Sequence, residues 1–361
     1  MESPPSGRRL AVKDLFDTAG LRTTYGSAIF ADHVPAQTAE SVLLLEAAGY
    51  ANVGKANLHE FAYGVTSENP HYGTVPNPRA EGRIAGGSSG GSAAALSAGL
   101  ADAALGSDSA GSIRIPAACC GVVGFKPSFG LVPIDGCFPL APSFDHAGPM
   151  AADIAECVRM MEALVPGFER IDIELPELRV GVAWLGEADP LVRARVEEAA
   201  QRFPNRREID LSVPDREQWG AAFRREVLES HAGLYPERAE DYGDDVRRSL
   251  EAATELTNSE VEAARRLRER LRDEVPRLLE GFDLLVTPTL PCVAPLLGHG
   301  SRTVLTKLTS LFNLLGWPAL AMPCGTAEDG LPASVQLAAP TGGDAFVLGA
   351  GAALERALSL D

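Results

Sequence analysis

Two blocks rich in glycine and serine constrain this 361-residue chain more than any other feature. The first covers residues 86–91 and continues into residues 92–101, which are almost all small. The second covers residues 106–116 and sets Ser112 among small neighbours, shortly before Arg114. Small side chains let a backbone come close to other groups, so a helix made of them is expected to be buried. The pattern predicts that both blocks approach a ligand or another segment closely.

The regions around the blocks alternate strand and helix signals. Residues 9–12 and 50–53 are predicted to be short buried strands, separated by a helix over 38–48 with a capping residue at Thr38. Strand-like apolar runs return late in the chain, at residues 284–288, 319–323 and 333–337. Residues 189–280 are charged and helical, which is typical of a solvated cover over a core. Core strands on both sides of this segment favour one interleaved α/β domain over two domains.

The charge of the chain argues against two classes of partner. It has 32 basic and 49 acidic residues and a net charge of −17, which repels nucleic acids and anionic membranes. The first residues lack the apolar centre of a signal peptide, and no run of 18 apolar residues occurs. We therefore expect a cytoplasmic protein that binds neither nucleic acid nor membrane.

The six cysteines do not indicate a metal site. They lack C-x-x-C pairs and histidine companions, so a structural zinc ion is not expected, and a reducing compartment is. Lysine is scarce, with four residues at positions 13, 55, 126 and 307. Unlike arginine, a lysine can lose its proton under mild conditions, so each one is a candidate base.

The first block alone allows several interpretations. Ser88 and Ser89 each occupy the centre of a G-x-S-x-G pattern, which is typical of the nucleophile elbow of α/β-hydrolases. That site needs a downstream histidine, and His146, His231 and His299 do not lie in segments that look like strand ends. A phosphate-binding loop would need a G-K-[ST] ending, which is missing. A tight glycine turn for helix packing is a further alternative.

Considered together, the two blocks resemble the defining sequence of the amidase signature family. Residues 86–95 and 106–128 are similar to it almost residue for residue. Residues 11–14 and 53–64 resemble the two lysine segments of that family. A resemblance of this length is far more specific than a three-residue motif.

The resemblance implies an α/β fold made of a single domain, with a large twisted mixed β-sheet surrounded by α-helices. The similarity is strong over residues 9–150 and weaker over 282–355. The implied organisation of residues 1–361 is a catalytic core block at 9–150, a helical insertion at 189–280 and returning core strands at 282–355.

The resemblance also implies roles for individual residues. Ser112 would be the nucleophile, Ser88 the middle member of a relay after a cis peptide bond at Gly87, and Lys13 the base. The oxyanion hole would be formed by the backbone N–H groups of Ser109, Ala110, Gly111 and Ser112.

Such a relay works without histidine. A serine hydroxyl is a poor nucleophile until a base takes its proton, and an amine can do so only if its pKa falls well below ~10.4. Burial lowers the pKa of a lysine by disfavouring its charged form. The negative charge of the chain acts in the opposite direction, so burial of Lys13 has to dominate.

Other residues near the blocks are expected to support the site. Asp108 is expected to hold the loop through backbone hydrogen bonds or to form an Asx turn. Arg114 is expected to brace the loop, with contact to a polar group of the substrate as the alternative. Lys55 is expected to be structural. His59 and His71 are expected to be surface or core residues rather than catalysts.

A third segment is implied to contact the substrate. By resemblance, the acyl pocket would be lined by Phe61, Ala62 and Tyr63, with plain core packing as an equal alternative.

Two features of the sequence depart from the family pattern. Ala110 replaces a common glycine and would be strained at positive φ. Relatives usually have helices before the residue that corresponds to Lys13, which only twelve residues precede here, so a more open entrance is expected.

The expected function is that of an amidase, which hydrolyses a linear carboxylic amide through an acyl-enzyme on Ser112. Esters and carbamates are chemically close substrates. No cofactor or metal is expected, the partner is a small-molecule amide, and a homodimer is compatible with the sequence. The first alternative is the amide-transferring subunit of a tRNA-dependent amidotransferase, which the short chain, short N-terminus and acidic balance disfavour. The others are a non-catalytic binding relative and a serine esterase of the α/β-hydrolase type.

Overall fold

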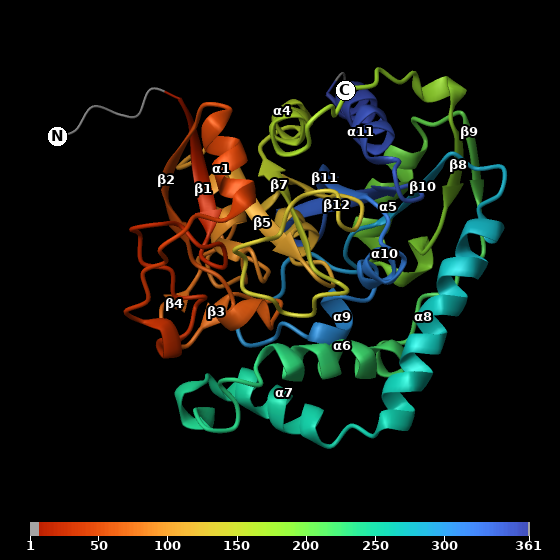
Figure 1. Ribbon diagram of the computed structural model, residues 1–361. Helices are drawn as coiled ribbons and strands as arrows, with labels where there is room; N and C mark the ends of the chain where they lie inside the picture. Colours follow the sequence, from red (N-terminus) through yellow and green to blue (C-terminus); the bar gives the residue numbers. More distant parts are fainter. Residues whose placement is uncertain (1–6, 360–361) are drawn as a thin grey trace.

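A ten-stranded mixed β-sheet runs through the computed structural model, which describes residues 7–359 (Figure 1). Its strand order is β2-β1-β5-β7-β6-β11-β12-β10-β8-β9. The strands are β1 (Arg8–Lys13), β2 (Tyr50–Ala56), β5 (Ala103–Asp108), β6 (Val123–Lys126), β7 (His146–Ala151), β8 (Arg179–Val182), β9 (Asn205–Glu208), β10 (Leu284–Pro288), β11 (Ala319–Thr326) and β12 (Pro332–Ala338). Pairing is parallel towards both edges and antiparallel from β5 to β10. A separate small sheet pairs β3 (Glu68–Asn69) with β4 (Gly73–Thr74).

Helices surround this sheet. They are α1 (Glu40–Ala47), α2 (Gly90–Ser97), α3 (Arg114–Cys120), α4 (Ile154–Leu164), α5 (Pro190–Ala200), α6 (Arg216–Ser230), α7 (Asp244–Thr254), α8 (Asn258–Leu278), α9 (Arg302–Leu305), α10 (Ser310–Leu315) and α11 (Asp344–Leu358). None of the helices within residues 7–359 combines the length and the apolar character needed to traverse a bilayer. The fold is thus the expected single α/β domain with a large mixed sheet.

The sheet separates two apolar cores, and β5 shows how. Ala103 and Leu105 pack in one cluster with residues of α4 and α11, whereas Ala104 packs in another with residues of α2 and α3. Successive side chains of a strand point to opposite faces, so these helix pairs cover opposite faces of the sheet.

The small residues of α2 allow the close packing that the sequence predicts. Ser92 and Ala93 are completely buried. A Cβ added at Gly91 would lie 2.3 Å from the carbonyl oxygen of Asn57, which no side chain tolerates. The helix therefore lies directly against the segment that follows β2.

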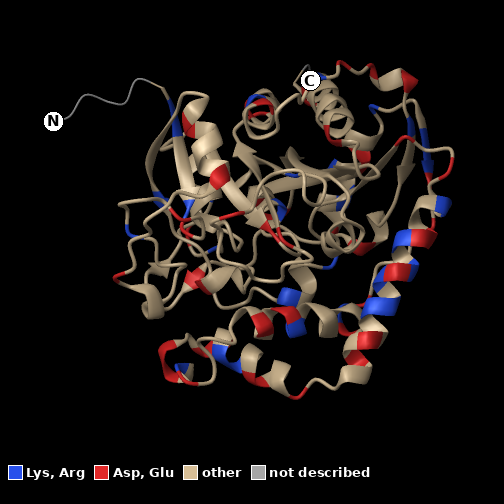
Figure 2. Cartoon of the chain, viewed as in Figure 1, with Lys and Arg blue, Asp and Glu red and all other residues tan. Residues whose placement is uncertain are grey.

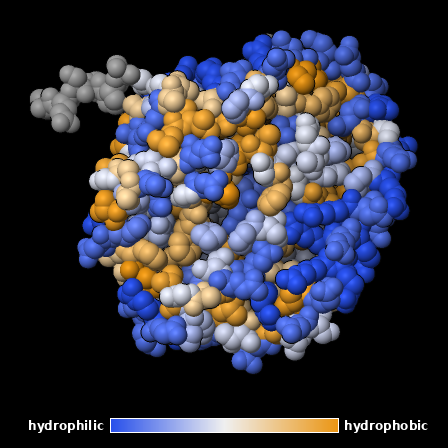
Figure 3. All heavy atoms as spheres, in the orientation of Figure 1, coloured by the Kyte–Doolittle hydropathy of each residue, from blue (hydrophilic) through white to orange (hydrophobic). Residues whose placement is uncertain are grey.

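The segment from α6 to α8 lies along the lower and right-hand side of the view, and α6 contacts both α7 and α8 (Figure 1). Basic and acidic residues alternate along α8 (Figure 2), and the surface there is mostly hydrophilic (Figure 3). A capping box starts α8, formed by Thr257 and Glu260. Earlier parts of the charged range 189–280 belong to the sheet layer, because α5 packs on β12 and β9 pairs with β8.

One predicted helix start is wrong. The helix expected over 38–48 begins at Glu40, after Ala39, and Thr38 does not cap it. The Thr38 hydroxyl instead accepts a hydrogen bond from the backbone N–H of Ala19 at 2.9 Å. A contact distant in sequence has replaced the local one.

Candidate active site

The sheet topology brings Lys13, Ser88 and Ser112 to one region. β1 and β5 are parallel neighbours, so their carboxyl ends lie at the same edge of the sheet. Lys13 is the last residue of β1, and Ser112 lies between β5 and α3. Ser88 lies just before α2, which packs against β1 and β5.

The amine of Lys13 is completely buried and contacts two hydroxyl groups. Its Nζ lies 2.7 Å from Ser88 Oγ and 2.8 Å from Ser107 Oγ. Burial lowers the pKa of Lys13 from 10.5 to about 7, against the opposing effect of the Asp108 and Asp145 charges. A large fraction of the amine is therefore uncharged near neutral pH. The sequence does not single out Ser107, because only the pairing of β5 with β1 places it beside the lysine.

Ser88 follows a cis peptide bond at Gly87, the isomer that the family resemblance implies. A Cβ on Gly87 would come within 2.9 Å of the Thr66 backbone nitrogen, so only glycine fits there. The carbonyl of Ser88 accepts hydrogen bonds from the His59 N–H at 3.2 Å and the Ser67 hydroxyl at 3.3 Å. These contacts fix the backbone that presents the Ser88 hydroxyl to the lysine.

Ser112 is 6% exposed and lies at the wall of a small cavity of about 30 Å³. Its carbonyl accepts a hydrogen bond from Ser89 N–H at 3.1 Å. Within residues 7–359, its hydroxyl forms no hydrogen bond with Ser88. The structure thus joins Lys13 directly to Ser88, while the Ser112 side chain is held only by its backbone position.

The loop before Ser112 is held by the carboxylate of Asp108, which accepts hydrogen bonds from Gly111 N–H at 2.7 Å and Ile113 N–H at 3.2 Å. The N–H of Gly111 is therefore paired with a carboxylate and is not a free donor, and its place in the oxyanion hole stays a prediction. The N–H groups of Ser109, Ala110 and Ser112 donate to no acceptor in the described part of the chain.

The strain expected at Ala110 does not occur. The positive φ of this loop, 133°, falls on Gly111, and Ala110 has an ordinary backbone conformation. The Ala110 carbonyl accepts a hydrogen bond of 2.6 Å from the Thr309 hydroxyl. A Cβ on Gly111 would lie 2.4 Å from the oxygen of that hydroxyl. In this loop glycine is therefore required at position 111 and not at position 110.

Arg114 braces the loop from behind. Its guanidinium makes two hydrogen bonds of 3.0 Å with Asp108, and both side chains are completely buried. The arginine also donates to the Thr309 carbonyl at 2.9 Å and to the side chains of Gln336 and Asn313 at 2.7 Å. Burial alone would raise the pKa of Asp108, but the charge of Arg114 holds it well below the usual range. The three partners from the last part of the chain carry no sequence signal of this role.

The three residues predicted to line the acyl pocket have different locations in the structure. Phe61 is completely buried, and its ring packs against the rings of Phe138, His231 and Tyr242. It does not line the cavity at Ser112, whereas Ala62 and Tyr63 do. Core packing, the alternative left open for this segment, applies to Phe61.

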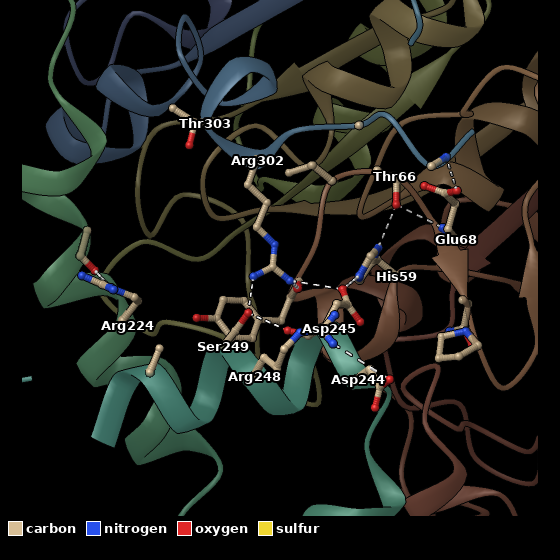
Figure 4. A pocket seen from close by; sticks show the side chains of 18 of the residues that line it. His59, Thr66, Glu68, Arg224, Asp244, Asp245, Arg248, Ser249, Arg302 and Thr303 are labelled. Carbon is tan, nitrogen blue, oxygen red and sulfur yellow. Dashed lines mark hydrogen bonds and ion pairs between the residues drawn. The ribbon is translucent and has the colours of Figure 1, made fainter. Parts of the chain in front are cut away.

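A larger basin of about 910 Å³ adjoins the small cavity. The two share four lining residues, Tyr63, Val65, Arg216 and Arg302. Figure 4 shows Arg302 reaching towards Ser249 and Asp245, with His59 beside the same aspartate. His59 Nε2 lies 2.7 Å from Asp245 Oδ2. The basin and the Ser112 cavity therefore meet at these four shared residues.

The remaining candidates have structural contacts. Lys55 Nζ donates to the Phe16 carbonyl and to the hydroxyls of Thr18 and Thr23, which ties down the loop after β1. His71 lies 3.0 Å from the buried carboxylate of Glu60. No histidine in residues 7–359 hydrogen-bonds to the side chain of Ser88, Ser89 or Ser112, so the site lacks the base of an α/β-hydrolase. The same residues contain no group of three or more His, Cys, Asp or Glu side chains arranged to hold a metal ion.

The large mixed sheet, with a buried lysine and two serines gathered at one edge, defines an α/β protein of the amidase signature type. The sequence agrees, because the model of the Amidase family matches residues 3–203 and 211–348. The chain belongs to the amidase family.

Similar proteins include a hydrolase and an amidotransferase. The chain is 36% identical to the AtzE subunit of the 1-carboxybiuret hydrolase of Pseudomonas sp. (strain ADP), over 98% of this chain and 84% of that protein. It is 37% identical to a subunit of the glutamyl-tRNA(Gln) amidotransferase of Thermus thermophilus, over 98% of this chain and 85% of that protein.

Solved structures of amidases and related hydrolases also superpose on this chain. A crystal structure of an amidase superposes with a TM-score of 0.89 at 36% identity, covering 97% of this chain and 84% of that one. A 6-aminohexanoate cyclic dimer hydrolase superposes with a TM-score of 0.84 at 27% identity, covering 98% and 86%. The structural neighbours thus include enzymes that act on C–N bonds.

Proposed function

We propose that this chain hydrolyses a carboxylic amide through an acyl-enzyme on Ser112, with Ser88 and Lys13 as the proton relay. The observation that carries the proposal is a completely buried amine, with a pKa near 7, 2.7 Å from a serine hydroxyl. Burying an amine without a carboxylate at hydrogen-bond distance is costly, and such perturbed groups cluster at functional sites.

In the first half of the proposed reaction, Ser112 Oγ attacks the carbonyl carbon of the amide. Its proton passes to Ser88 Oγ, while the proton of Ser88 passes to the neutral Nζ of Lys13. The carbonyl π electrons move onto the oxygen, and a tetrahedral intermediate forms. Its collapse breaks the C–N bond, and the proton returns through Ser88 to the departing nitrogen. Water then repeats the sequence on the acyl-enzyme and releases the acid.

This sequence needs a hydrogen bond between Ser112 and Ser88. Rotation of the Ser112 side chain about its Cα–Cβ bond would form it when substrate binds, because catalytic hydrogen bonds often reach full strength only in the complex. We propose that the unpaired N–H groups of Ala110 and Ser112, with that of Ser109, stabilise the oxyanion. Loss of one such donor typically costs ~3 kcal/mol of transition-state stabilisation.

Amide transfer is the second candidate, because the chain is 37% identical to a glutamyl-tRNA(Gln) amidotransferase subunit. Hydrolysis and transfer share the acyl-enzyme and differ in the fate of the ammonia. The net charge of −17 disfavours a tRNA partner. The purified chain alone, without tRNA or nucleotide, should therefore release ammonia and carboxylic acid in equal amounts. Ammonia release that depends on added partner subunits would favour transfer.

The nucleophile can be tested by covalent labelling. A fluorophosphonate probe should form one adduct, which peptide mass spectrometry should locate on Ser112, and Ser112→Ala should lose both the adduct and turnover of a panel of amides, esters and carbamates. An adduct on Ser88 or Ser89 would contradict the assignment. Absence of any adduct, together with absence of turnover, would favour a non-catalytic binding protein.

We further propose that residues 1–361 work as one unit on a small-molecule amide, without nucleic acid, membrane or cofactor. Residues 9–150 would form the catalytic core and 282–355 would complete the sheet, while the helices within 189–280 would cover the entrance. The cytoplasm is the compartment we propose, and the six free cysteines of the chain support it.

A further inference from the structure

Arg216 occupies an unusual position for a basic residue. It is the first residue of α6, directly after the capping residue Asp215. A positive charge is unfavourable there, because the amino end of a helix already carries partial positive charge. The side chain turns into the site, where its Nη1 donates to Thr306 Oγ1 at 3.1 Å and its guanidinium stacks over the Trp219 ring at 5.4 Å. Neither partner is charged.

The cavity at Ser112 has an unbalanced positive charge. Its charged lining residues are Arg216 and Arg302, and none of the acidic side chains within residues 7–359 lines it. Arg302 is paired with Asp245, 3.3 Å away. Arg216 forms no ion pair with any residue of the described chain, so one guanidinium charge is left over in a chain whose net charge is −17.

The other charged groups around Arg216 do not supply the missing partner. Arg224 and Arg302 are its charged neighbours, and burial together with these two charges lowers the pKa of Arg216 to about 10. Glu217 is exposed and makes no ion pair with Arg216. Among the acids of the wider basin, Asp244 pairs with Arg247 and Arg248, Asp245 with His59 and Arg302, and Glu68 accepts a backbone hydrogen bond from Gly298.

We infer that the substrate carries a carboxylate, which Arg216 binds while the scissile amide lies against Ser112. A guanidinium fork matches the two oxygens of a carboxylate, and pairing would offset the cost of holding the unpaired charge in a partly buried site. The basin is also lined by Arg224, which makes no ion pair in the described chain, and by the four carboxylates of Glu68, Glu217, Asp244 and Asp245. These four negative charges favour a monoanion over a phosphate dianion. This inference rests on the proposed amide hydrolysis and names its substrate class.

A matched pair of amides tests the inference. Succinamate and butyramide have similar size and differ by one carboxylate. Wild-type enzyme should prefer succinamate in kcat/KM by at least about 10-fold, the range for a hydrogen bond to a charged group. Arg216→Met should lower kcat/KM for succinamate by about 10-fold to 100-fold and change that for butyramide less than about 3-fold. Arg265→Met, which removes an exposed arginine of α8 that makes no ion pair in the described chain, should leave both unchanged.

A binding experiment separates this inference from the proposed reaction. Succinate should slow fluorophosphonate labelling of Ser112 in the wild type, and should have at least about 10-fold weaker effect in Arg216→Met. Equal loss of both amide activities in Arg216→Met, or butyramide as the better wild-type substrate, would overturn the carboxylate inference and leave amide hydrolysis standing. Turnover of neither amide, with normal protection by succinate, would instead count against hydrolysis and retain the anion site.

Discussion

The lowered pKa of Lys13 makes the stability of this protein depend on pH in a predictable direction. The pKa is about 7 in the folded chain, against 10.5 for an ordinary lysine. Below about pH 7 the Lys13 amine is protonated in both the folded and the unfolded chain. The folded chain then carries the full cost of burying a charged amine, which is at most ~5 kcal/mol. Between pH 7 and 10.5 the unfolded state keeps the proton that the folded state has lost, and stability rises with pH by ~1.4 kcal/mol per unit.

Replacement of Lys13 by methionine removes this dependence. It also removes the contacts with Ser88 and Ser107, which changes the unfolding free energy by an amount that does not vary with pH. We therefore expect the difference in unfolding free energy between wild type and Lys13→Met to change by ~2 kcal/mol between about pH 7 and pH 9, in favour of the wild type at the higher pH. The measurement is urea unfolding followed by circular dichroism.

The control is Lys307→Met, which removes a half-buried lysine paired with Glu187 and should follow the wild-type curve. The titration can also be observed directly, since only four lysines contribute to a spectrum of protein labelled with ¹³C at lysine Cε. The signal that is missing in Lys13→Met should titrate with a midpoint near 7. A midpoint close to that of an ordinary lysine, or an unfolding difference that does not vary with pH, would refute the argument that burial prepares this amine as a base.

Two further predictions concern activity. The kcat/KM of the wild type should rise about tenfold per pH unit below about pH 7 and level off above it, because the free enzyme must lose one proton from Lys13. Lys13→Arg should be inactive, since arginine keeps its proton. A pH profile of kcat/KM without a break between about pH 6 and 8 would exclude Lys13 as the base. Gly111→Ala should reduce turnover by at least about 100-fold, because its Cβ would lie 2.4 Å from Thr309 Oγ1 at a φ of 133° and displace the oxyanion loop. Gly186→Ala, with open space around the added Cβ, is the matched control, and unchanged turnover in Gly111→Ala would disprove the role of this loop.

The sequence is most informative where the contacts are local. The glycine and serine blocks predict the buried helix α2 and the loop around Ser112, because close backbone packing leaves small residues as a visible pattern. Ala110 and Gly111 show the limit of that pattern, since a common glycine at position 110 of the family does not say whether the backbone there needs positive φ. The predicted Thr38 cap is wrong because the Thr38 hydroxyl accepts a hydrogen bond from the Ala19 N–H, a contact that the local sequence does not indicate.

Contacts between distant segments left no such pattern. The support of the Ser112 loop by Thr309, Asn313 and Gln336 depends on how β11, β12 and α10 pack against α3. An isolated threonine, asparagine or glutamine has no spacing that marks it. Arg216 is equally hidden, because it lies in a stretch of charged residues that is typical of a solvated surface.

Arg114 and Lys13 are both buried beside the Ser112 loop, but they have different kinds of hydrogen-bond partner. This difference explains how the site can contain both basic groups. Arg114 shares two hydrogen bonds with Asp108, so a carboxylate compensates its charge. Within residues 7–359 the hydrogen-bond partners of Lys13 are both hydroxyls, and burial lowers the pKa of its amine to about 7. If Asp108 faced the lysine instead of the arginine, their attraction would keep the amine charged and unable to act as a base. The pairing of Asp108 with Arg114 thus fixes the loop that carries Ser112 and directs that carboxylate to the arginine, so that only its longer-range charge acts on Lys13.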